Sequence, residues 1–204
     1  MKMIIHSFLA ALSLMIAMPA WAADSQGPRE VIESTVHEII SVLEKRADKT
    51  KLTEDDRNYI RKAVEGRFDY EAMARRSLGK PWRDLNKAER AHFTEVFREL
   101  LERSYGNRLN EYKGQTVQFE NAELRKDKAR VLSTVIDEAR QIPVEYRLHQ
   151  TETGWQVYDI SIEGTSMVRT FYQDFQSILD NGGYAKLLNT LEEKIAKLKA
   201  KDQA

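Results

Sequence analysis

The chain of 204 residues has no cysteine and few residues that break regular structure, with four prolines and nine glycines. Without cysteine the protein can have no disulfide bond, no thiolate zinc ligand and no cysteine nucleophile. It also has no excess of either charge, because 32 basic side chains balance 32 acidic ones. This balance argues against nucleic acid as a partner, since phosphate binding needs clustered cations that displace counterions. Hydrophobic residues make up 42% of the chain, an ordinary globular composition.

The long apolar run of the sequence lies at its N-terminus. Lys2 precedes an almost unbroken apolar stretch over residues 4–18, and Ala20-Trp21-Ala22 fits the A-x-A cleavage pattern. The stretch is shorter than the roughly 20 residues that a membrane-spanning helix needs. We therefore predict that residues 1–22 are a signal peptide and that residues 23–204 form a single exported domain, held together by its hydrophobic core.

Apolar residues recur at helical spacing through the first half of the mature chain. A first helix is expected from Pro28, because proline is favoured in the first helical turn. Capping residues and glycines delimit a second helix over residues 53–66 and a third over residues 69–78, which ends at Gly79. A fourth and longest helix is predicted over residues 86–112, with an apolar face formed by Phe93, Phe97, Leu100, Leu101, Tyr105, Leu109 and Tyr112.

After Gly114 the apolar period changes to 2, and β-branched residues predominate. Strands are expected around residues 117–119, 131–136, 142–149 and 155–162. The turns between them are short, so neighbouring strands are antiparallel. Pro143 indicates an edge or a bulge. Two further helices follow, from Thr165 or Ser166 and after Asn181-Gly182-Gly183, so the predicted class is α+β: an antiparallel sheet of about four to five strands packed with N- and C-terminal helices.

Few residues are arranged for catalysis. The histidines of the mature chain, His37, His92 and His149, are far apart in sequence and match no metal-binding spacing. The stretch around Ser166 follows a strand and precedes a helix, as a hydrolase nucleophile does, but the second glycine and the parallel sheet of that motif are missing. Capping of the following helix explains Ser166. We therefore expect no enzyme, no metal and no cofactor.

The remaining feature of the sequence that could serve a function is its apolar surface. The helix after Thr165 is apolar over a wide arc, and the strand over residues 131–136 is apolar on both faces. Periodicity alone favours a filled core as the explanation of such stripes. It does not distinguish a filled core from a cavity.

Several motifs, in order and with similar spacing over about residues 29–199, resemble the MlaC family, also called toluene-tolerance periplasmic proteins. The motifs are FDYEAMA at 68–74, LGKPW at 78–82, FTEVFRELL at 93–101 and leading to Tyr105, GWQVYD at 154–159 and IEGTS at 162–166. The resemblance implies a monomeric periplasmic carrier that moves a diacyl phospholipid between the outer and inner membranes and maintains outer-membrane asymmetry. The partners it implies are an inner-membrane ABC transporter with an MCE-domain protein, and an outer-membrane lipoprotein complex.

The resemblance also implies a curved sheet and helices that enclose an apolar pocket for the acyl tails, with the headgroup in water. Strand alternation and helix period then predict which side chains face the pocket or core, although a slip of one residue would reverse the assignment of any strand. The predicted lipid-binding residues are Leu101, Tyr105, Leu109, Val117, Phe119, Val131, Val135, Val144, Tyr146, Leu148, Val157, Ile160, Met167, Phe171 and Phe175.

Three other hypotheses stay open at this point. One is a relative that carries a rigid polycyclic lipid, a hopanoid, in place of a phospholipid. Another is an enzyme on a cone-shaped α+β fold, in which a buried acid, Asp159, transfers a proton on an apolar small molecule. Such an acid would titrate well above about 4, whereas a surface or capping acid would not. The third is a structural interaction protein with a filled core.

Overall fold

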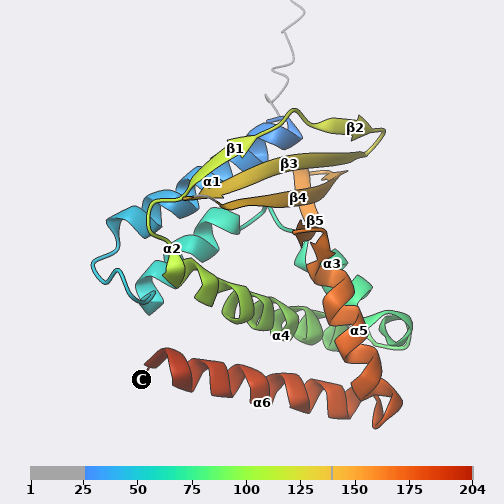
Figure 1. Cartoon of the computed structure of the whole chain (residues 1–204). Helices are drawn as coiled ribbons and strands as arrows, with labels where there is room; N and C mark the ends of the chain where they lie inside the picture. The colour runs from blue at the N-terminus through green and yellow to red at the C-terminus, as the bar shows by residue number, and fades with distance from the viewer. Residues whose placement is uncertain (1–25, 139, 204) are drawn as a thin grey trace, which may run out of the picture.

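The computed structural model describes residues 26–138 and 140–203, so the predicted signal peptide lies outside the described residues. Figure 1 shows the order of the elements: four helices, then a sheet, then two helices. The α+β class predicted from the sequence is confirmed. The helices are α1 (Pro28–Lys45), α2 (Glu54–Val64), α3 (Tyr70–Leu78), α4 (Lys87–Gly106), α5 (Met167–Asp180) and α6 (Gly183–Gln203), with 3₁₀ turns η1 (Lys80–Arg83) and η2 (Asn107–Glu111).

Side-chain caps fix where the helices begin. Thr53 and Asp56 form a reciprocal capping box at the start of α2, and Asn86 and Glu89 form another at the start of α4. Asp69 accepts a hydrogen bond from the amide of Ala72 and so caps α3. These polar side chains satisfy amides that would otherwise have no partner, which is why the predicted helix starts agree with the structure.

The predicted fourth helix was too long at its C-terminal end. The α-helix ends at Gly106 and continues as the 3₁₀ turn η2. The buried guanidinium of Arg46, at the end of α1, donates to the carbonyls of Leu109, Asn110 and Tyr112. These contacts from a distant residue hold the carbonyls away from the regular helical pattern, so helical spacing alone could not reveal the change.

The sheet is antiparallel throughout, with strand order β1-β3-β4-β5-β6 and β2 paired to β3 beside β1. Two short strands, β2 and β6, add to the four that periodicity predicts. Pro143 pairs with Thr134 of β3 and lies just beyond the last pair of β4 with β5, while the bulge occurs elsewhere, at Arg147/Leu148. The strands are β1 (Thr116–Phe119), β2 (Glu123–Arg125), β3 (Lys128–Asp137), β4 (Arg140–Thr151), β5 (Gly154–Ile162) and β6 (Thr165–Ser166).

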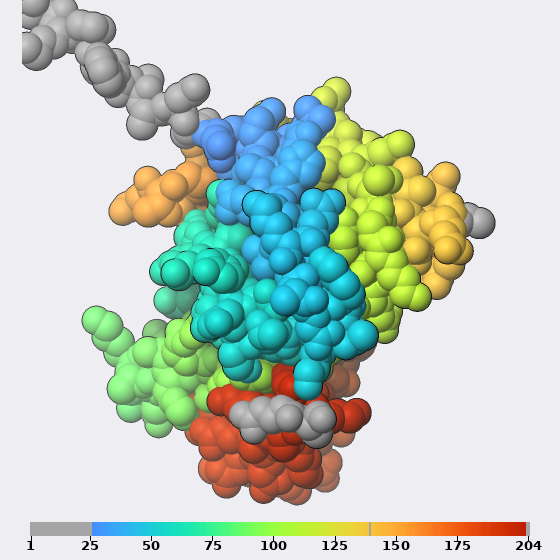
Figure 2. Space-filling view, turned by 90° about the vertical axis from the view of Figure 1, so that its left-hand side faces the viewer, coloured from blue at the N-terminus to red at the C-terminus, as the bar shows by residue number. Residues whose placement is uncertain are grey.

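The elements form layers. In Figure 1 the sheet lies at one side with α1 along it, while α4 and α6 run next to each other on the far side. Figure 2 shows α1 and α2 on one surface, with α1 beside β1 and α6 at the opposite end of the molecule. Helices α3 and α5 pack on each other and touch β5, so they join the two sides. Within the residues described, no helix is long and apolar enough to span a bilayer.

Buried apolar side chains form two clusters. We call the first the helical cluster; it unites α3, η1, α4, α5 and α6 and includes Phe93, Phe97, Phe171 and Phe175. We call the second the sheet cluster; it consists of Val31 and Ile32 of α1 with Ala129, Val131, Leu148 and Val157 of the sheet. The half-buried side chain of Ile160 packs against both clusters.

Candidate functional site

One face of the sheet, which we call the inner face, carries all nine strand residues predicted as lipid-binding. Direct cross-strand partners point to the same side of a sheet. Four rows of paired residues cross the strands on this face. The rows are Val117–Val135, Phe119–Ser133–Val144, Val131–Tyr146–Ile160 and Leu148–Val157. The bulge in the β4–β5 ladder keeps Val157 and Ile160 on one face although their spacing is odd.

Helix α1 covers one end of the inner face. Val131, Leu148 and Val157 are completely buried there against Val31 and Ile32. These three predicted site residues therefore belong to the core of the sheet cluster. The sequence showed the apolar stripe of α1 but not what the stripe packs on, because helical period gives a face without naming its partner.

The predicted helix residues lie in the helical cluster, with one exception. Leu101, Met167, Phe171 and Phe175 are buried, and half-buried Tyr105 packs against them. Aromatic rings meet edge to face: the ring centroids are 5.3 Å apart for Phe97 and Phe171, and 6.2 Å apart for Tyr105 and Phe171. Leu109 instead lies in η2 and is half-buried.

Away from the end that α1 covers, the inner face keeps accessible apolar surface. Val117, Val135 and Ile142 form one half-buried row across β1, β3 and β4. Ile142 was absent from the predicted set, although the alternation of β4 places it on this face. On β4 the two ends of this face therefore differ, because Leu148 is completely buried and Ile142 is half-buried.

Tyr146 lies at the centre of this face and is the main polar group among apolar neighbours. Protein surrounds its phenol so closely that desolvation raises its pKa, although nearby Ser133 lowers it in part. The side chain nevertheless keeps accessible surface. Tyr146 is therefore less completely buried than Val131 and Leu148 on the same face.

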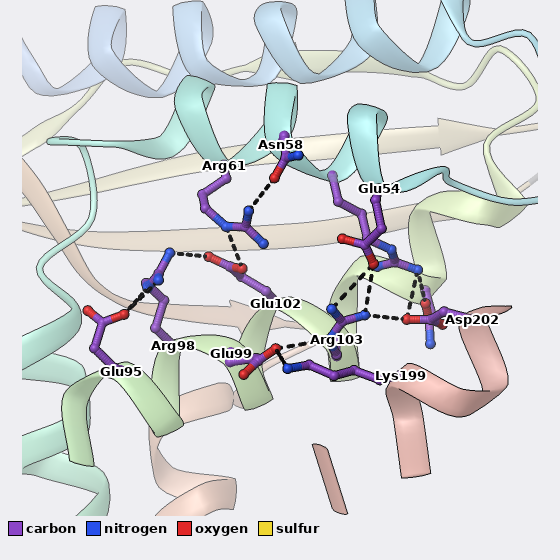
Figure 3. Close-up of polar contacts among 12 residues, drawn as sticks. Glu54, Asn58, Arg61, Glu95, Arg98, Glu99, Glu102, Arg103, Lys199 and Asp202 are labelled. Atoms are coloured by element: carbon purple, nitrogen blue, oxygen red, sulfur yellow. Dashed lines mark hydrogen bonds and ion pairs between the residues drawn. The ribbon is translucent and has the colours of Figure 1, made fainter. Parts of the chain in front are cut away.

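Two surface cavities, of about 480 and 550 Å³, lie elsewhere, among charged residues of α2, α4 and α6. Figure 3 shows the ion pairs beside them, which we call the ionic network. Arg103 and Arg57 both approach Asp202 Oδ2, at 2.7 and 3.2 Å, and Arg103 also reaches Glu54 at 3.3 Å. The opposing charges already satisfy one another, so these cavities do not suit acyl chains.

Asp159 and Ser166, the candidates for catalysis, have structural partners. Ser166 Oγ accepts from the amide of Arg169 and donates to Asp159 Oδ2 at 2.7 Å. Asp159 Oδ1 accepts from the amide of Val168. Both residues therefore cap α5, as predicted for Ser166. Across residues 26–138 and 140–203, no three His, Asp or Glu side chains gather as a metal site would require.

The histidines are separated in space as they are in sequence. His149 Nε2 lies 2.9 Å from Asp69 on the outer face, and exposed His92 lies 3.2 Å from Glu192. His37 contacts Phe119 edge to face. Each therefore has a local partner of its own.

The chain is similar to a known protein family and to individual proteins. The family model described as MlaC protein matches residues 33–193. The intermembrane phospholipid transport system binding protein MlaC of Haemophilus influenzae is 23% identical over 158 residues, which are 72% of this chain and 73% of that protein. Toluene tolerance protein ttg2D of Pseudomonas putida is 22% identical over 179 residues, 84% of this chain and 82% of that protein.

A solved structure shares the fold. The phospholipid-binding protein from Ralstonia solanacearum, solved in complex with a phospholipid, matches with a TM-score of 0.75. The match covers 85% of this chain and 99% of the other, at 22% sequence identity.

Proposed function

Because the family model covers residues 33–193, this chain belongs to the MlaC family, and we propose that it binds a phospholipid and carries it between membranes. The observation that carries the proposal is the incompletely covered inner face of the sheet, with half-buried Val117, Val135, Ile142 and Tyr146. Its support is the shared fold with a protein that was solved with a phospholipid bound.

The proposed contacts of the acyl chains are narrower than the set predicted from sequence. They are the half-buried residues of the inner face and two half-buried helix residues, Tyr105 and Leu109. Fully buried Val131, Leu148, Val157 and Phe175 instead stabilise the two clusters. A charged residue at Phe171, 5% exposed, would therefore disrupt folding before it affected binding.

The energetics favour carriage over catalysis. Two acyl chains hold about 30 methylenes, and exposing them to water costs roughly 24 kcal/mol at about 0.8 kcal/mol each. Transfer from a bilayer into a protein exchanges one apolar environment for another, so its net free energy can be small and the transfer reversible. The direction of transport must then come from partners.

The remaining features of the proposal follow from the family. We place the carrier in the periplasm after removal of residues 1–22, with residues 23–204 acting as one domain. Its partners would be an inner-membrane ABC transporter with an MCE-domain protein and an outer-membrane lipoprotein complex. The proposal includes no reaction, in keeping with the capping roles of Asp159 and Ser166.

Lipid identification tests the proposed function. The mature protein is purified from a bacterial periplasm, weighed as an intact complex by native mass spectrometry, and extracted with organic solvent for lipid analysis. About one diacyl phospholipid per protein is expected. A polycyclic lipid would replace the proposal with the hopanoid carrier, and an empty protein that takes no lipid from vesicles would overturn it.

A further inference from the structure

Two hydroxyl groups lie next to each other on the otherwise apolar inner face. Ser133 of β3 is 2% exposed and lies between Phe119 and Val144 in its cross-strand row. Tyr146 of β4 lies in the adjacent row, between Val131 and Ile160. Apolar residues of similar size would pack at both positions, so the hydroxyls are not needed to fill space.

The hydrogen-bonding capacity of Ser133 is not used by the described residues. Ser133 Oγ is buried and has no hydrogen-bond partner among the described residues. Ser133 is close enough to the Tyr146 phenol for its hydroxyl to lower the pKa of Tyr146 in part, so the two hydroxyls lie within reach of each other. Buried polar groups are almost always paired, so the unpaired Ser133 hydroxyl points to the Tyr146 oxygen as its acceptor, which leaves the Tyr146 proton for a group supplied from outside.

The two hydroxyls indicate which kind of ligand group could bind them. Both groups are neutral, so a neutral acceptor suits them better than a phosphate or carboxylate, whose burial without a counter-ion is costly. In a diacyl phospholipid, the neutral acceptors next to the hydrocarbon are the ester carbonyls at the top of each tail. A carbonyl that accepted from Tyr146 would leave the tail along the inner face and the headgroup toward water.

We propose that Tyr146 donates a hydrogen bond to an ester carbonyl of the carried lipid, while Ser133 donates to the Tyr146 hydroxyl oxygen. Tyr146 is then the residue that fixes how deeply the lipid enters, and Ser133 is a positioning residue. This inference rests on the proposed function and adds a preference to it: the protein distinguishes ester-linked from ether-linked chains.

A pair of lipids that differ in this group alone provides the test. Dipalmitoyl phosphatidylglycerol and its dihexadecyl ether analogue share headgroup and chain length, but the ether lacks both carbonyls. Equal amounts of the two are offered in mixed vesicles to the delipidated mature protein, and native mass spectrometry measures the bound ratio. One hydrogen bond predicts a preference for the ester of about fivefold, which corresponds to about 1 kcal/mol.

Three variants separate a hydrogen bond from packing. Tyr146→Phe keeps the ring, so the preference should fall to about onefold while uptake of the ether lipid stays unchanged. Ser133→Ala should reduce the preference in part and keeps the test available if Tyr146→Phe does not fold. Tyr158→Phe, whose ring contacts His149 and Arg76 on the outer face, is the matched control and should keep the full preference.

The possible results distinguish failure of the proposed Tyr146 contact from failure of the proposed carrier function. An equal loss of ester and ether binding in Tyr146→Phe would overturn the carbonyl contact, and so would uptake of both lipids by the unmodified protein without preference. Uptake of neither lipid by the unmodified protein would overturn the carrier function itself.

Discussion

The helical cluster and the sheet cluster both consist of apolar side chains, but they differ in how completely those side chains fill the space around them. The helical cluster has seventeen buried members, and several of its aromatic rings meet edge to face. The sheet cluster has six buried members, and beyond them the inner face stays half-buried at Val117, Val135 and Ile142. Stability therefore comes chiefly from the helical side, which leaves the sheet free to keep the uncovered apolar surface that a ligand would need.

The ionic network also stabilises the helical side of the molecule. It joins α2, α4 and α6 through Arg57, Arg103 and Asp202, all of which are nearly buried. Its side chains come from helices and not from the strands (Figure 3). Loss of an ion pair there should consequently change stability without changing lipid uptake.

The largest loss of stability is expected for Phe97→Ala in the helical cluster. Phe97 is fully buried and contacts Phe171 and Phe175, so its truncation leaves a cavity. We expect the free energy of unfolding to fall by about 3–5 kcal/mol. Chemical denaturation measures this fall, with Tyr59→Ala as a control, because Tyr59 is 60% exposed and should change stability by at most about 0.5 kcal/mol. Equal effects would contradict the assigned role of the helical cluster.

A smaller loss is expected for Asp202→Asn in the ionic network. The change leaves Arg57 and Arg103 without the anion they share. Loss of one partner of a fully buried ion pair costs about 3–5 kcal/mol. The cost is smaller here because the end of α6 can open and let water reach the two arginines, so we expect the free energy of unfolding to fall by about 2 kcal/mol. Denaturation and amide exchange of α6 measure the effect, with exposed Glu193→Gln as control. If lipid uptake fell in parallel, the two regions would not be independent.

On the inner face, Val135→Asp should cost less stability but abolish lipid uptake. Val135 is half-buried, so the carboxylate stays partly hydrated in the free protein, at a cost of about 1–2 kcal/mol. An acyl chain over it would remove that water. Thr134→Asp, one position along β3 on the opposite face, is the matched control. Vesicle uptake is measured for both, and a folded Val135→Asp that still takes lipid would refute the placement.

The smallest effect concerns pH. Desolvation alone would raise the pKa of Glu99, but hydrogen bonds from Lys199 and Arg103 outweigh it and hold that pKa below the ordinary 4.5. A carboxylate with a lowered pKa stabilises the fold above its unfolded pKa, and this contribution is lost as pH falls through the folded value. We expect Glu99 to account for less than about 1 kcal/mol of the stability lost from about pH 5 to pH 3. Comparing unfolding of Glu99→Gln with the unmodified protein over this range isolates its share; parallel curves would exclude a contribution.

Local signals in the sequence were enough to predict much of the fold. Thr53, Asp69 and Ser166 mark helix starts because capping acts over three residues. Strand alternation placed Val117, Val135 and their cross-strand partners on one face because side chains alternate with period 2.

Contacts between distant residues could not be predicted in this way. Arg46 shapes η2 from 63 residues away, and Arg103 meets Asp202 across 99 residues. The split of the candidate site into two buried clusters and a half-buried inner face depends on where α1 lies, which its own period does not specify. Only the burial seen in the structure separates core residues of the inner face, such as Leu148, from its half-buried residues, such as Val135.

The most direct test of the central claim is photo-crosslinking of lipid from the inner face. A photoreactive benzoylphenylalanine replaces Val135 in one variant and Thr134 in another, and each folded protein is loaded from phospholipid vesicles, irradiated and analysed by mass spectrometry. The account predicts a lipid adduct from position 135 and little or none from position 134. Equal adducts from both positions, or an adduct from position 134 alone, would contradict it.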